Sequence, residues 1–197
     1  MTIDDLRPLL SAIGIVLTIA GFVPYVLGIV KGRVRPHMFS WLIWGITTLL
    51  VFIAQLQDGG GIGAWPIGVS GLTTLVVALL AYMNRADTTV TQTDWLFLFL
   101  ALSSLPVWYV TANPLWAVVI LTSVDLLGFG PTYRQVWHRP WSDSIMFFTL
   151  LAARNLLVLI ALENYSVTTM LFPAAIGLAS LGLIVILVTR RRALPAL

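Results

Sequence analysis

Two ionisable residues, Asp125 and Arg154, fall in the middle of long apolar stretches of this sequence, whereas the other acids and bases fall in expected loops or near helix ends. A charge facing lipid at the centre of a bilayer costs at least about 2.5–3.5 kcal/mol, so both side chains should point into the protein or into a wet cavity. We expect them to pair with each other and to open for a zwitterionic or strongly hydrogen-bonding solute. A buried ion pair with a purely structural role is the alternative.

Neutral polar residues are expected at the same depth as the two charges. Counting from the expected loop ends places several threonines and one asparagine near the midplane, where carriers built from repeats bind their substrates. Trp44 lies one turn deeper than the tryptophans expected at the membrane interfaces, and it either packs, closes a gate or stacks on a solute. The predicted substrate-binding residues are Asp125, Arg154, Asn155, Thr18, Thr47, Thr48, Thr73 and Trp44.

No set of residues in the sequence indicates an enzyme. The chain contains no cysteine, and its two histidines, His37 and His138, lie in expected loops, so neither a disulfide nor a cluster of histidine metal ligands is expected. Catalytic triads, paired carboxylates and phosphate-binding loops are also missing from the sequence. We therefore expect no catalytic residue, no metal and no cofactor.

The composition is that of an all-α integral membrane protein. Hydrophobic residues make up 59% of the chain and charged residues 10%, against about 25% charged residues in a soluble domain. About 20 apolar residues are needed to span a bilayer. Seven stretches meet or approach this length, the fourth being the shortest: 9–30, 38–56, 62–83, 95–110, 115–137, 145–162 and 168–189.

The distribution of basic residues predicts the orientation of these helices. Short loops rich in Lys and Arg stay on the cytoplasmic side. The loops at the other side contain a single basic residue, Arg7. The N-terminus is therefore expected outside and the C-terminus inside a bacterial-type cytoplasmic membrane. The net charge of +3 is therefore a topology signal and does not imply a nucleic-acid partner. The basic residues on the cytoplasmic side are Lys31, Arg33, Arg35, Arg85, Arg134, Arg139, Arg190, Arg191 and Arg192.

An internal repeat relates the two ends of the chain. The Gly-Phe-x-Pro motif at 21–24 recurs at 128–131, an offset of 107 residues given by the difference between positions 21 and 128, and the same offset relates Pro66 to Pro173. Repeats at a fixed register indicate duplicated structural units. We expect two parallel three-helix repeats joined by a linker helix, a 3+1+3 arrangement with boundaries at 9–83, 84–112 and 113–190.

The prolines of the repeated motif, Pro24 and Pro131, lie inside expected helices. Proline removes a helical hydrogen bond and clashes with the carbonyl four residues earlier, which kinks the helix. We expect the two prolines to act as hinges when one repeat rocks against the other. Proline is also tolerated in membrane helices without any such role.

The 3+1+3 plan, with a proline toward the inner end of the first helix of each triplet, resembles the SWEET and PQ-loop (MtN3-like) superfamily. The chain departs from its motifs, since Tyr25 and Thr132 follow the two prolines where a glutamine marks the PQ-loop, and 38–56 and 145–162 lack the proline common in SWEET carriers. The resemblance implies a carrier for a sugar, an amino acid or a vitamin-like metabolite, working by alternating access. A receptor or scaffold of the same fold that does not transport is the alternative.

The partners expected from this reading are a small-molecule solute and the lipid bilayer. The sequence does not identify the solute, and it does not distinguish uniport from proton-coupled transport. The oligomeric state is also open, and a homo-oligomer is possible.

Overall fold

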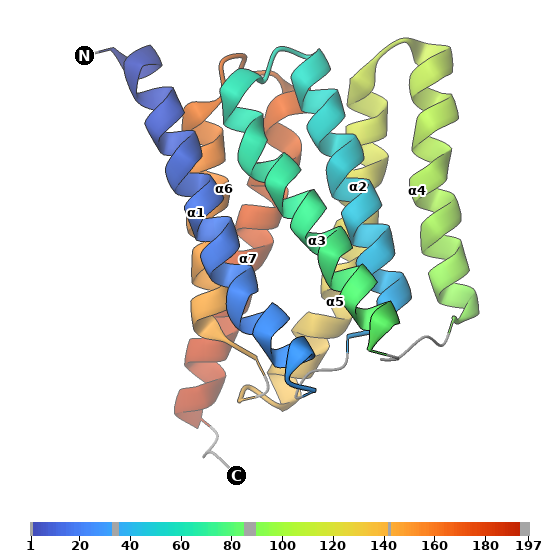
Figure 1. Ribbon diagram of the computed structural model, residues 1–197, viewed down its shortest axis with the longest axis vertical. Helices are drawn as coiled ribbons and strands as arrows, with labels where there is room; N and C mark the ends of the chain where they lie inside the picture. Colours follow the sequence, from blue (N-terminus) through green and yellow to red (C-terminus); the bar gives the residue numbers. More distant parts are fainter. Residues whose placement is uncertain (1, 33–35, 85–89, 142, 194–197) are drawn as a thin grey trace.

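The computed structural model describes residues 2–32, 36–84, 90–141 and 143–193, and for Pro131 only the backbone. The described chain is α-helical, as expected, and forms one bundle (Figure 1). Its elements in chain order are α1 (Ile3–Val30), α2 (Met38–Gln57), the short 3-10 helix η1 (Gly61–Ala64), α3 (Trp65–Met83), α4 (Gln92–Thr111), α5 (Pro114–His138), α6 (Ile145–Ala161) and α7 (Val167–Ala193).

Six helices of the described chain are long and apolar enough to cross a membrane: α1, α2, α3 together with η1, α4, α5 and α7. The remaining helix, α6, is also apolar but has only 17 residues. The prediction that the fourth helix is the shortest is therefore wrong, because α4 has 20 residues. Its start is extended by a capping box, in which the Thr91 hydroxyl accepts from the Asp94 amide and the Asp94 carboxylate accepts from the Thr91 amide.

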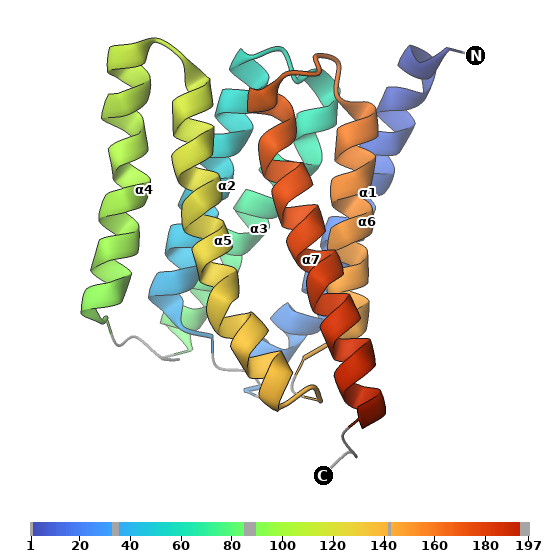
Figure 2. The same cartoon turned by 180° about the vertical axis from the view of Figure 1, so that it is seen from behind.

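The N-terminus and the C-terminus lie at opposite ends of the bundle (Figure 1). The N-terminal end also holds the α2–α3, α4–α5 and α6–α7 connections, and the C-terminal end holds the other three (Figures 1 and 2). In the bundle, α3 contacts both α1 and α2, and α7 contacts both α5 and α6. The two groups meet where α1 packs on α6 and where α2 packs on α5, while α4 packs against α5 and α2 at the side.

The hydrophobic core is continuous at the N-terminal end and divided at the C-terminal end. One cluster near the N-terminal end joins residues of six helices, α2 to α7, among them Val51 of α2, Leu121 of α5 and Val158 of α6. Toward the C-terminal end, one cluster around Val136 contains only α5, α6 and α7, and another around Ile29 contains only α1, α2 and α3. The two groups of helices are thus joined by a broad apolar cluster at the N-terminal end. Toward the C-terminal end they share only a smaller cluster, formed by Phe39 and Ile43 of α2 with Val124 of α5.

Candidate functional site

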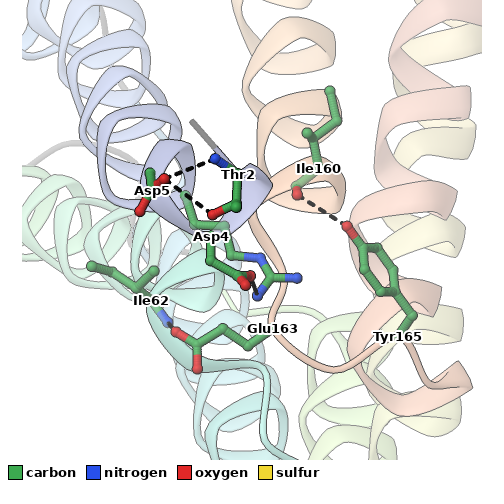
Figure 3. Close-up of polar contacts among 8 residues, drawn as sticks. Thr2, Asp4, Asp5, Ile62, Ile160, Glu163 and Tyr165 are labelled. Carbon is green, nitrogen blue, oxygen red and sulfur yellow. Dashed lines mark hydrogen bonds and ion pairs between the residues drawn. The ribbon is translucent and has the colours of Figure 1, made fainter.

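The connections at the N-terminal end are held together by polar contacts between the α2–α3 and α6–α7 segments. The Glu163 carboxylate accepts from the Ile62 amide at 3.0 Å (Figure 3), and the Asn164 side chain donates to the Asp58 carbonyl at 2.7 Å. The Ser166 hydroxyl donates to the Asp58 carboxylate. We call these five residues, Asp58, Ile62, Glu163, Asn164 and Ser166, the N-terminal seal.

Close packing and a buried hydrogen bond support the N-terminal seal from below. Gly63 lies so close to α6 that an added Cβ would be 2.5 Å from the Ala161 carbonyl, so only glycine fits there. Fully buried Gln55 of α2 donates from its side chain to the Thr169 carbonyl of α7 at 2.7 Å. These contacts hold the α2–α3 segment against α6, and α2 against α7, at this end of the bundle.

A cavity of about 630 Å³ lies between the two groups of helices. It reaches from polar side chains at mid-depth to Asp143 and Ser144 in the α5–α6 connection, at the C-terminal end where the core is divided. Cavities of 300–1,000 Å³ with apolar walls and a few polar groups are typical small-molecule sites. The polar side chains at mid-depth are Thr48, Ser70, Thr74, Asp125 and Arg154, and aromatic rings of α1, α2 and α5–α7 form much of the wall.

Asp125, on α5, lies in the cavity wall with 6% of its surface exposed. Its carboxylate accepts a hydrogen bond from the Thr47 hydroxyl of α2, with 2.9 Å between the two oxygens. The Thr47 hydroxyl also lies 3.0 Å from the Trp44 carbonyl, so it is held in place by its own helix. The contact satisfies one side of the acid and joins α5 to α2.

Arg154, on α6, lines the same cavity with only 3% of its surface exposed. Within the described part of the chain its guanidinium forms neither a hydrogen bond nor an ion pair, and its buried Nη1 has no partner. The predicted Asp125–Arg154 ion pair is therefore wrong. The helices α5 and α6 follow each other in the chain, but each packs along α7 instead of along the other, which separates the two charges.

The remaining predicted residues occupy three kinds of position. Thr48 and Trp44 line the cavity. Thr18 lines a separate small cavity of about 20 Å³, together with Arg154, and donates to the Gly14 carbonyl of its own helix. Asn155 and Thr73 line neither cavity, and their side chains donate to the Leu151 and Val69 carbonyls at 2.8 Å.

Two cavity residues, Ser70 and Thr74 of α3, were not among the predicted site residues. They are four residues apart and therefore lie one above the other on the same face of the helix. Thr73 is the neighbour of Thr74, but one residue turns a helix by about 100°, which carries its side chain away from the cavity. The i, i+4 spacing of two hydroxyl side chains is the sequence signal for this face.

The predicted hinges lie inside continuous helices. Pro24 lines the cavity in α1, which runs without interruption from Ile3 to Val30. Pro131 lies inside α5, and its side chain is outside the described part of the structure. The role of either proline as a hinge stays a prediction.

No protein-family model, no curated protein and no solved structure matches this chain. What the cavity binds is therefore inferred from its own geometry. That geometry combines an acid engaged on one side, an unpartnered base and a wall of aromatic rings, in a space large enough for a small metabolite.

Proposed function

We propose that this protein is a membrane carrier that moves a small polar solute by alternating access. One observation carries the proposal: a cavity with charged and hydroxyl side chains at mid-depth reaches the C-terminal end of the bundle, while the N-terminal seal closes the opposite end. A site near the midplane that is reachable from one side at a time is the arrangement on which carriers depend.

We further propose that the chain is built as 3+1+3, with units at 9–83, 84–112 and 113–190. The helix contacts support this, because α3 contacts α1 and α2 as α7 contacts α5 and α6. The offset of 107 residues also maps the α2–α5 interface onto the α1–α6 interface, so Thr47 and Asp125 correspond to Arg154 and Thr18. Such a relation fits the parallel repeats of a SWEET-like carrier.

The proposed orientation places the N-terminus outside and the C-terminus in the cytoplasm. Its support is the excess of basic residues at one end, of which Arg33, Arg35 and Arg85 lie outside the described residues. In this orientation the cavity faces the cytoplasm. Single cysteines that replace exposed Tyr165, in the α6–α7 connection, and exposed Asn84, at the end of α3, should then react with an impermeant reagent from outside and from inside, respectively, in this otherwise cysteine-free chain.

Counterflow in proteoliposomes tests the transport proposal. Vesicles that contain the purified protein are loaded with an unlabelled metabolite and diluted into a trace of the same metabolite in labelled form. A panel of amino acids, sugars and vitamins that first raises the unfolding temperature supplies the candidates. A carrier accumulates label transiently, and empty vesicles do not. A metabolite that binds the protein but is never exchanged would instead identify a receptor of the same fold.

A further inference from the structure

Arg154 carries a buried polar atom that has no partner in the described part of the protein. The other buried side-chain atoms without a partner belong to Arg7, Gln55, Thr122 and Asn155, which do not line the large cavity. Moving an ion from water into a protein interior costs several kcal/mol even after relaxation, and an opposite charge or good hydrogen bonds normally offset this cost. The guanidinium has five N–H donors in a planar fork. In the described part of the chain none of them has an acceptor, although the side chain is almost fully buried and lines the cavity.

The deep part of the cavity contains one charge of each sign. Asp125 and Arg154 both line it, and no ion pair joins them. Asp143, the third acidic or basic residue of the wall, lies in the α5–α6 connection at the C-terminal end, where its carboxylate accepts from the Gln135 side chain. A ligand at mid-depth therefore meets a cation on α6 and, separately, an acid on α5.

We propose that the solute is a zwitterion with an apolar body, whose carboxylate binds the guanidinium of Arg154 and whose ammonium group faces Asp125. The proposal rests on the carrier function proposed above and names its substrate class. Guanidinium and carboxylate match each other in a two-pronged arrangement, which makes arginine the preferred partner of a carboxylate. The Thr47 hydroxyl occupies one side of the Asp125 carboxylate, and the acid keeps further acceptor sites for an ammonium group.

Charge balance favours a zwitterion over other small polar solutes. A neutral sugar would leave Arg154 buried without an opposite charge, and a phosphate ester would bring up to two negative charges into the cavity that already contains Asp125. A zwitterion adds no net charge and provides each buried ion with a partner. The wall around it is apolar and includes Phe22, Phe147, Phe172 and Ile176, which fits an aliphatic or aromatic side chain.

Three probes of similar size distinguish the contribution of the ligand's carboxylate to binding from that of its ammonium group. Leucine has both charged groups, leucinamide has the ammonium group without the carboxylate, and 4-methylpentanoate has the carboxylate without the ammonium group. Their affinities are measured by isothermal titration with the purified full-length protein and with the variants Arg154→Gln, Arg154→Lys and Asp125→Asn. Thr149→Val is the matched control, because Thr149 is exposed on α6 and donates only to the Ile145 carbonyl.

We expect leucine to bind the wild type and the control at least about tenfold more tightly than either half-probe. Arg154→Gln should remove the preference for leucine over leucinamide. Asp125→Asn should remove the preference for leucine over 4-methylpentanoate. Arg154→Lys keeps the charge but loses the planar fork, so it should keep a reduced preference for leucine over leucinamide. Leucinamide binding as tightly as leucine, a preference that survives Arg154→Gln, or no binding of any probe would overturn the inference.

The failure of this inference is distinguishable from the failure of the carrier proposal. Counterflow of glucose by a wild type that binds none of the three probes would reject the zwitterion site and leave the carrier in place. The expected binding pattern without counterflow of leucine would support the zwitterion site and reject transport.

Discussion

The two interfaces between the groups of helices, α2–α5 and α1–α6, differ in the contacts that their corresponding residues make. At the α2–α5 interface, the Thr47 hydroxyl donates to Asp125 and closes the contact. At the α1–α6 interface, the corresponding residues Thr18 and Arg154 surround a cavity of about 20 Å³ and form no hydrogen bond with each other in the described structure. The α2–α5 interface gives its charged group one hydrogen bond within the protein, and the α1–α6 interface gives its charged group none.

The glycines of the repeated motif show the same contrast. A Cβ added to Gly128 would lie 2.9 Å from the Trp44 indole nitrogen, so α5 and α2 are packed as closely as they can be at this point. The nearest atom to a Cβ added to Gly21 belongs to Phe147 at 3.9 Å, which is an ordinary contact. We infer that α2 and α5 are in tight contact at Gly128, whereas α1 and α6 leave room at Gly21 although they share the more extensive interface.

The largest expected effect is the separation of binding from stability at Arg154. Replacing it by Met should weaken binding of the transported solute by about 10- to 100-fold, because a charge-assisted hydrogen bond is worth about 1.5–3 kcal/mol. The same change should leave the solute-free protein equally stable or stabilise it by about 1–4 kcal/mol, since an unpaired buried charge is removed. Titration and thermal unfolding of the same preparations check both parts. A large loss of stability would show that Arg154 is a structural residue.

The second effect compares one substitution at the two corresponding glycines. Gly128→Ala should destabilise the protein by about 1–3 kcal/mol, because the added methyl group displaces Trp44. Gly21→Ala should be neutral or stabilising by up to about 1 kcal/mol, because alanine favours the helix and fits the space. Thermal unfolding measures the difference, and tryptophan fluorescence should change only for Gly128→Ala. Equal destabilisation by both changes would contradict the contrast between the interfaces.

The smallest effect concerns the two corresponding threonines. Thr47→Val should cost about 1 kcal/mol, or somewhat more, because it removes a hydrogen bond to a buried acid. Thr18→Val should cost less, because the Thr18 hydroxyl bonds only a carbonyl of its own helix. A double-mutant cycle with Asp125→Asn isolates the Thr47 contact, and we expect coupling there and none for Thr18. Equal coupling at both sites would remove the difference between the interfaces.

The sequence was sufficient to predict that the two charged residues of the site are buried, but not how they lie relative to each other. Asp125 and Arg154 are buried in the bundle as expected, because a charge that faces lipid is costly. Their separation follows from α7 packing on both α5 and α6, and the chain order of the helices contains no information on this.

Two further features depend on the three-dimensional arrangement of the helices, which the sequence of an apolar helix does not reveal. A helix that is apolar all round gives no periodic signal, so the choice between Thr73 and Thr74 required the actual rotation of α3. The N-terminal seal was also not foreseen. Asp58 and Glu163 lie in connections between helices, and their partners Ser166 and Ile62 are more than 100 positions away in the sequence.

The most direct test of alternating access measures, from each side of the membrane, how fast a cysteine in the cavity reacts. Thr74→Cys is introduced into the cysteine-free chain, and oriented vesicles are treated with an impermeant thiol reagent. A carrier in the conformation described here should react faster from the side of the C-terminus. Adding Asp58→Ala and Ser166→Ala, which remove a contact of the N-terminal seal, should raise the rate from the side of the N-terminus and lower it from the other. Rates that rise together on both sides, or no reaction from the side of the N-terminus, would contradict the proposed mechanism.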